Sequence, residues 1–283
     1  MTSRPEDLRR TLIGEKDRSP DLTIVQWNVL ADWAAFGSFD RAPTDSLPWD
    51  VRGPRVLTLL EDGLPQPPDV ICLQEVDRHD DLAEALCARG YAAEFVPKEE
   101  GRDGCSMFVR AATHALVATQ TVRYREPDGT PHSQLALIAQ LRNLADGGII
   151  QVATTHLKAK PGHEELRLRQ VEQLIAGLDA SLPTIVTGDF NDVPGSLAHA
   201  HVATHLRSAY ADVLGAEPAW TTWKVRGDEE TRRTIDYVWY SEPHFRALSC
   251  LDLPAEDRVQ PERFPSWQYP SDHLSLAVQF ARR

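Results

Sequence analysis

Acidic, amide and imidazole side chains recur in this sequence at the ends of short apolar runs. Asn28 follows the run 22–27, and Glu75 closely follows the run 69–73. The same pattern includes His156, Asp189, Asn191, Asp236, Asp272 and His273. Magnesium takes oxygen ligands in octahedral geometry and keeps several waters, so one or two carboxylates are enough to hold it. The pattern therefore indicates a site for a hard divalent cation, where the other polar groups can orient water and stabilise developing negative charge.

Each of these residues has an ordinary structural explanation when it is taken alone. An asparagine after a strand is usually a turn or cap residue. An isolated histidine such as His156 is more often a hydrogen-bonded core residue than a catalyst, and the pair Asp272 and His273 matches simple turn chemistry. The occurrence of all these residues in one chain, each beside an apolar run, is what favours a functional site.

The apolar runs that would position these residues read mostly as strands. The predicted strands are 22–27, 69–73, 92–96, 105–109, 116–124, 135–141, 149–155, 184–187, 235–240 and 274–280. Helical patterns cover only 54–60, 80–89 and 164–178. So many consecutive strands do not fit a strictly alternating parallel sheet, and they favour mixed sheets covered by helices. We expect a polar arm over residues 1–20 and a single domain over 21–283.

The composition of the chain limits which partners and which cellular compartment we expect. The formal net charge is −12, so the chain would repel a long polyanion except at a local basic pocket. The four cysteines are widely spaced, which favours reduced buried thiols over a zinc or disulfide framework. No apolar run resembles a signal peptide or approaches the roughly 18 residues of a membrane span. We expect a cytoplasmic protein with no membrane partner.

Six stretches of the chain match an ordered set of known motifs. They are QWNVL at Gln26, LQEVD at Leu73, TTHLKA at Thr154, TGDFND at Thr187, TIDYVWY at Thr234 and SDHLSL at Ser271. This set resembles the endonuclease/exonuclease/phosphatase superfamily from about residue 22 to residue 280. The resemblance implies a four-layer α/β sandwich, in which two mixed β-sheets pack face to face and helices flank them. It also implies an active site at one edge of the sandwich.

Other stretches are similar to the deadenylase-like branch of that superfamily, and within it to the nocturnin-like enzymes. They are FVPKEEGRDGCSMF at Phe95, SQLALIAQL at Ser133, THLKAKPG at Thr155, TTWKVR at Thr221 and RFPSWQYPSDHLSL at Arg263. The resemblance implies hydrolysis of the 2′-phosphate of NADP or NADPH. Relatives in the branch cut poly(A) or 2′,5′-linked oligoadenylate. One departure is Lys160, where the nocturnin-like pattern has arginine, so a bidentate phosphate contact would be lost there.

The resemblance also assigns roles to the polar residues. Glu75 would be the principal Mg²⁺ ligand, with Mn²⁺ as a substitute, and Asn28 and Asp272 would lie close to the ion. Asp189 would position or deprotonate the attacking water, while His156 and Asn191 contact the phosphoryl group. His273 would make a further contact to that group, oriented by Asp236.

Four basic residues lie in the nocturnin-like stretches, and we expect them to form a local phosphate-binding pocket: Lys98, Lys158, Lys160 and Arg226. The expected substrate is therefore a small nucleotide, and the expected state is a monomer. The core motifs are shared with nucleases, so the alternative is a 3′-exoribonuclease with the same metal site. An inactive binding protein is disfavoured because none of the acidic, amide or imidazole residues is missing.

Overall fold

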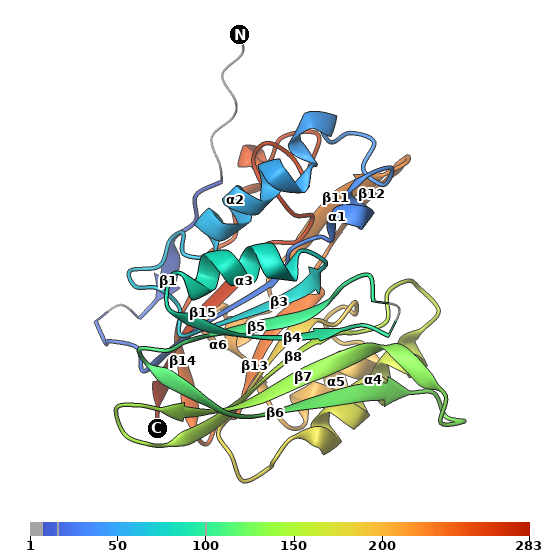
Figure 1. The fold of residues 1–283 in the computed structure, drawn as a ribbon. Coiled ribbons are helices and arrows are strands. Elements are labelled where there is room, and N and C mark those ends of the chain that lie inside the picture. Colours follow the sequence, from blue (N-terminus) through green and yellow to red (C-terminus); the bar gives the residue numbers. More distant parts are fainter. Residues whose placement is uncertain (1–7, 16, 100) are drawn as a thin grey trace.

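The computed structural model describes residues 8–15, 17–99 and 101–283. Within these residues, two large mixed β-sheets pack face to face and helices cover their outer faces (Figure 1). This arrangement is the four-layer sandwich that the sequence predicts. The described part of the chain contains no helix that is both long and apolar enough to cross a membrane.

The first sheet has seven strands in the order β1-β14-β15-β2-β3-β5-β4. Their bounds are β1 Leu12–Gly14, β14 Phe245–Leu251, β15 Leu276–Arg282, β2 Leu22–Asn28, β3 Val70–Val76, β5 Gly104–Arg110 and β4 Tyr91–Pro97. Strands β2 and β3 are parallel, and β15 runs antiparallel to β2. This sheet therefore joins the N-terminal, central and C-terminal parts of the sequence.

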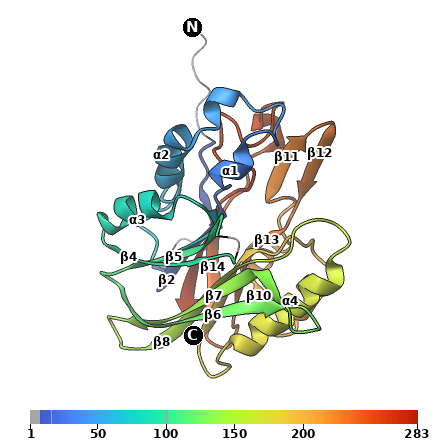
Figure 2. The same cartoon turned by 45° about the vertical axis from the view of Figure 1, so that its right-hand side comes forward.

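The second sheet has six strands in the order β10-β13-β9-β8-β7-β6. Their bounds are β10 Arg207–Ser208, β13 Asp236–Tyr240, β9 Thr184–Asp189, β8 Ile149–His156, β7 Pro131–Asn143 and β6 His114–Arg125. A separate two-stranded hairpin, β11 Thr222–Arg226 with β12 Glu229–Arg233, projects beside the segment that follows β2 (Figure 2).

Alternation along the central strands explains the layers. In β3, Val70 and Cys72 face the second sheet, while Ile71 and Leu73 face the helices. Successive side chains of a strand point to opposite faces, so a strand that is apolar at every position is buried on both sides. The core between the sheets is completed from the second sheet by residues such as Val152.

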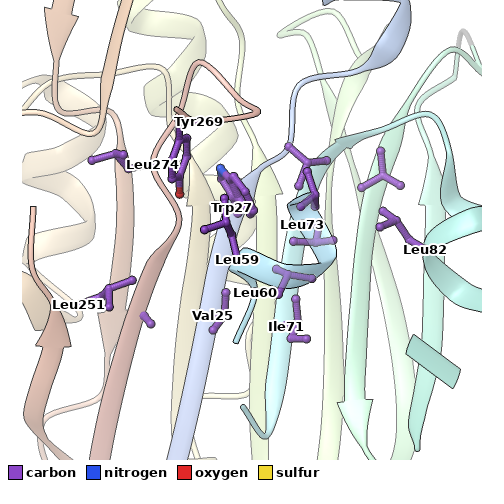
Figure 3. Packing of buried hydrophobic residues seen from close by; sticks show 14 of the residues in the cluster. Val25, Trp27, Leu59, Leu60, Ile71, Leu73, Leu82, Leu251, Tyr269 and Leu274 are labelled. Carbon is purple, nitrogen blue, oxygen red and sulfur yellow. The ribbon is translucent and has the colours of Figure 1, made fainter. Parts of the chain in front are cut away.

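Helices cover each outer face. Against the first sheet lie α2 Trp49–Leu59 and α3 His79–Cys87, and Figure 3 shows Leu59 and Leu60 packed near Trp27 and Val25. Against the second sheet lie α4 Glu164–Gly177 and α5 Leu197–Ala203. Two further helices, α1 Asp32–Ala35 and α6 Ala209–Leu214, are short.

Residues 8–15 are part of the folded region, so the predicted polar arm is wrong there; residues 1–7 lie outside the described residues. Strand β1 pairs antiparallel with β14, and Leu8 is buried. The buried Arg10 side chain donates hydrogen bonds to the carbonyl oxygens of Asp252, at 2.6 Å, and Ser275, at 2.5 Å. The apolar and basic residues in this short segment are too few to show periodicity, which is why the sequence did not predict the strand.

Two smaller expectations also need correction. The helix predicted at 54–60 begins at Trp49 and continues through Pro54. The buried Arg52 guanidinium holds its first turns, since it donates to the carbonyl oxygens of Leu47 and Val29. The cysteines are free as expected, but Cys87 is exposed at the end of α3, while Cys72 and the other two are buried.

Candidate active site

The strands of both sheets bring the predicted site residues to one edge of the sandwich. In the second sheet, His156, Asp189 and Asp236 lie side by side, because β8 pairs with β9 and β9 pairs with β13 at these positions. In the first sheet, Asn28 ends β2 beside the end of β3. Since β15 is antiparallel to β2, His273, which precedes β15, reaches the same edge.

Unusual backbone geometry marks this edge. Glu75 has φ +54°, at an irregularity in the pairing of β3 with β5. Gly188 has φ +149°, and a Cβ atom there would lie 2.1 Å from the carbonyl oxygen of Thr155. Asn191 has φ +50°. Positive φ at non-glycine residues costs energy that folded structures retain mostly at functional sites, and only glycine fits between β8 and β9 at position 188.

Two carboxylates converge on one amide at the centre of the site. The Asn28 side-chain nitrogen donates to Glu75 Oε1 and to Asp189 Oδ2, each at 3.0 Å. Carboxylate oxygens of Glu75 and Asp189 and a ring nitrogen of His156 lie within 4.8 Å of one another. The set is rich in oxygen donors, carries two carboxylates and has an amide beside it. It therefore fits a hard divalent cation such as Mg²⁺.

A carboxylate and an imidazole form the expected pair beside this centre. His273 Nδ1 lies 2.9 Å from Asp236 Oδ2, and both side chains are buried. The Thr221 hydroxyl donates to the same oxygen at 2.6 Å. Burial alone would lower the pKa of His273, but Asp236, Asp272 and Asp189 raise it to about 9. His273 is therefore a cation at neutral pH, and its Nε2 faces Asp189 Oδ2 at 3.8 Å.

His156 has the opposite environment. Burial lowers its pKa well below the usual value, and the nearby Lys98 ammonium adds to the effect. Lys98 Nζ lies 3.3 Å from His156 Nδ1. An ammonium group can only donate, so Nδ1 accepts and Nε2 carries the proton. That Nε2 lies 3.7 Å from Asp189 Oδ2. His156 thus presents a neutral N–H donor to the centre of the site.

Asp189 lies between the two imidazoles. Burial raises its pKa to about 6, and the His273 cation opposes this effect. Its other carboxylate oxygen accepts from the backbone N–H of Asn191 at 2.8 Å. The Asn191 side-chain nitrogen donates to the carbonyl oxygen of Leu157 at 3.1 Å, which leaves its second N–H available. Asp189 is therefore held firmly, with a pKa near neutrality.

Asp272 lies among cations. Lys224 Nζ is 2.5 Å from Asp272 Oδ2, and an Arg226 nitrogen is 3.6 Å from the same oxygen. Burial would raise the pKa of Asp272, but Lys224, His273 and Arg226 hold it below its usual range.

Lys98 is paired with Asp103 at 2.6 Å. Of the four predicted phosphate-binding residues, Lys98 and Arg226 therefore border the site directly.

Lys158 and Lys160 lie on a loop fixed to α4. The buried Arg167 guanidinium donates to the carbonyl oxygens of Lys158, at 3.2 Å, and Lys160, at 3.0 Å. Lys160 has φ +80° and is exposed. No contact of these two ammonium groups with the acidic centre is seen among the described residues. Their loop directly follows His156, and their part in phosphate binding stays a prediction.

Sequence reasoning missed several residues that support the site: Lys224, Thr221, Gln26 and Gln74. Lys224 and Arg226 lie two apart on strand β11, so strand periodicity could have paired them. Gln26 stands inside an apolar run and Gln74 directly follows one, so neither amide was assigned a role. The Gln26 amide nitrogen donates to Gln74 at 3.0 Å and to Asp236 Oδ1 at 3.3 Å, and Gln74 donates to Thr154 at 2.8 Å.

The sequence profile of the endonuclease/exonuclease/phosphatase family matches residues 25–273. The chain belongs to this family. Its members are metal-dependent hydrolases of phosphoric esters, which agrees with the acidic centre described above.

Individual relatives make the comparison more specific. Human nocturnin is 37% identical over an aligned length of 287 residues, and the alignment covers 93% of this chain and 65% of nocturnin. The solved structure of the human nocturnin catalytic domain with bound sulfate has a TM-score of 0.80 and 32% identity, and it covers 100% of both chains. ANGEL2, a 2′,3′-cyclic phosphatase solved with adenosine-2′,3′-vanadate, has a TM-score of 0.81 and covers 96% of this chain and 98% of its own. At 20% identity, ANGEL2 shows only a shared fold.

Proposed function

We propose that the chain is a magnesium-dependent phosphomonoesterase that removes the 2′-phosphate of NADP and NADPH. The proposal rests on one observation, namely that three cationic side chains surround the acidic centre. Lys98 contacts His156, and Lys224 and Arg226 contact Asp272. In a chain with a net charge of −12, these cations form a compact local site for a phosphate dianion. The similarity to nocturnin supports the choice of NADP(H).

Glu75 would hold the cation as its principal ligand, and Asn28 would reach it directly or through water. Asp272 would lie close to it, as the resemblance implies. Bound Mg²⁺ would neutralise charge on the phosphoryl oxygens and help to orient the water. Phosphoryl transfer depends mainly on positioning and charge stabilisation, so the protein needs no covalent intermediate.

The protein's own residues supply the proton chemistry. Asp189, with a pKa near 6, can accept a proton from the attacking water near neutral pH. His156 donates a neutral hydrogen bond from Nε2, and His273 donates a charged one from its own Nε2. The free N–H of Asn191 gives a further donor. Together these groups stabilise charge on the equatorial oxygens as it develops.

The alternative function is removal of nucleotides from the 3′ end of poly(A) or 2′,5′-oligoadenylate with the same metal centre. The two functions are separated by an assay of purified protein with Mg²⁺ on NADP, NADPH and a labelled oligo(A). We expect phosphate and NAD(H) as products, formed much faster than the oligo(A) is shortened. Rapid shortening with no NAD formed would overturn the proposal. We also propose that the protein is a monomer and that it is cytoplasmic. Gel filtration with light scattering tests whether it is a monomer.

A further inference from the structure

A rim of the active site carries two exposed aromatic side chains. Trp33 and Phe36, in and directly after α1, are 52% and 51% exposed. Large aromatic side chains usually contribute to the buried area of a fold, and these two are instead half exposed. Trp33 is also contacted by an arginine from another element, and this contact links it to the site.

The backbone of α1 is fixed to the metal-binding end of β3. The N–H of Ala31 donates to Glu75 Oε2 at 3.3 Å, and the N–H of Trp33 donates to Asp77 Oδ2 at 3.2 Å. Consecutive Cα atoms are about 3.8 Å apart, so the Cα of Trp33 lies within about 8 Å of the Cα of Ala31. The Cα of Trp33 is therefore held near Glu75, within a reach that the sugar and base of one nucleotide can span.

The arginine that contacts Trp33 is Arg102, which lies in the loop between β4 and β5. The Arg102 guanidinium carbon lies 5.5 Å from the centre of the Trp33 ring. The next residue, Asp103, pairs with Lys98, which contacts His156. Trp33 is thus linked to Glu75 through the backbone at Ala31, and Arg102 is linked to His156 through Asp103 and Lys98.

An open volume adjoins Arg102, the partner of Trp33 in this contact. Arg102 lines a cavity of about 280 Å³ together with Asp77, Phe95 and Asp103. Heteroaromatic bases stack on tryptophan rings and on guanidinium planes, and they do so with little dependence on sequence. The carboxylates of Asp77 and Asp103 add acceptors that suit the amino group of a base.

We propose that Trp33 and Arg102 bind the base attached to the ribose that carries the hydrolysed phosphate, so that the site selects nucleotides over other phosphomonoesters. This rests on the proposed function in one respect, namely that the phosphate is held at Glu75 and Asp189. The shared chemistry is the base, whether it belongs to a free nucleotide or to the end of an RNA.

The test compares a phosphate ester that has a base with one that has none. Adenosine 2′-monophosphate and glycerol 2-phosphate are both phosphate monoesters of a secondary alcohol, and only the first carries a base. For Trp33→Ala we expect KM for adenosine 2′-monophosphate and NADP to rise about tenfold or more with kcat nearly unchanged. Values for glycerol 2-phosphate should not change. Trp33→Phe should retain most of the affinity, because it keeps an aromatic face.

Leu144→Ala is the matched control, because Leu144 is 53% exposed and follows β7, away from the site. An equal change in KM for both esters, no change for either, or a change for NADP alone would overturn the proposal. Calorimetric binding of adenosine 2′-monophosphate and of a short oligo(A) is measured in parallel. If the nucleotide is bound through Trp33 but not hydrolysed, the proposed reaction fails while base stacking stands. If only the oligo(A) is bound and cut in a Trp33-dependent way, the base belongs to an RNA end.

Discussion

His156 and His273 lie 3.7 and 3.8 Å from the same oxygen of Asp189, yet their surroundings give them opposite charges. His156 is buried beside an ammonium group, which makes its protonation costly. His273 is equally buried but faces three carboxylates, which stabilise its imidazolium. One site thus contains a neutral donor and a charged donor, and the difference depends on Lys98 and Asp236 rather than on the imidazoles themselves.

The first prediction concerns the cation. Glu75→Gln keeps the shape of the side chain but removes the charge that holds a hard ion, so activity should fall by about 100-fold or more with folding preserved. Phosphate release and the thermal unfolding midpoint are measured together. EDTA should inactivate the unmodified protein, and Mg²⁺ or Mn²⁺ should restore it.

Glu84→Gln is the control for this change, because Glu84 is an exposed residue of α3. It should leave activity unaltered. Full activity in the presence of chelator would contradict a metal-dependent mechanism.

The second prediction concerns Asp236 and His273, which are in direct contact. If Asp236 orients and charges His273, then Asp236→Asn and His273→Ala should each lower kcat by about 10²- to 10⁴-fold. The double variant should be little worse than the worse single variant, since residues that act as one unit are not additive. Losses that multiply would show that the two residues act independently.

At the scale of elements, a buried polar chain links the two sheets beneath the site. It runs from Asp236 on β13 through Gln26 on β2 and Gln74 on β3 to Thr154 on β8. These side chains are almost fully buried. The chain passes from the second sheet to the first and back, so it fixes the relative position of the strands that carry Asn28, Glu75, His156 and Asp236.

The third prediction tests that chain. Gln26→Met keeps the length of the side chain but removes the donor to Asp236, so kcat should fall about 10- to 100-fold, as for other residues that orient a catalytic group. Gln151→Met is the matched control: Gln151 is also buried, on the same strand as His156, and donates to Asp179 and Thr184 far from the site. Both changes leave buried acceptors unpaired and should cost about 1–3 kcal/mol of stability.

Only Gln26→Met should reduce kcat, with KM and metal dependence kept. The readout is steady-state kinetics together with denaturant unfolding. Equal catalytic losses in the two variants would mean that destabilisation alone accounts for the effect.

Strand ends were predictable where apolar runs meet polar residues, and elements built from polar residues were not. The sequence located Asn28, Glu75, His156 and Asp189 at strand ends, because the change from apolar to polar is visible there. Strand β12 reads EETRR and shows no apolar period, so the hairpin that carries Lys224 was missed. The hairpin is stabilised by contacts on the Trp223 ring, which packs under the guanidinium of its cross-strand partner Arg232 and under that of Arg263 from outside the hairpin.

The loop of Lys158 and Lys160 shows a second limit of sequence reasoning. The nocturnin-like stretch that contains them predicts phosphate binding, and the structure adds that Arg167 holds the loop by its backbone carbonyl groups. Such a contact is made to main-chain atoms, which every residue has. The residue types in the sequence therefore do not predict it. The pairing of Arg167 with Asp192 at 3.1 Å, both buried, likewise depends on the fold as a whole.

At the scale of the whole molecule, charge is distributed unevenly. The net charge is −12, and the cations that touch the catalytic centre are Lys98, Lys224 and Arg226. A protein that binds a long nucleic acid releases counterions along a basic track, so its affinity rises with strand length and falls steeply with salt. The contacts described here offer a compact anion site instead. Under the proposed function, such a site suits a small nucleotide better than a polymer.

The last prediction follows from this distribution and uses the length of an oligo(A). Lengthening the strand from about 4 to about 20 nucleotides adds negative charge against an acidic surface and gains little from counterion release, so kcat/KM per 3′ end should stay level or fall. The rates are measured at low and at moderate salt, with NADP as the reference substrate. A basic track on the surface would instead raise kcat/KM by tenfold or more with length, and salt would abolish the gain. That result would favour the exoribonuclease function, because a phosphatase that acts on one compact phosphate has no use for the remainder of the strand.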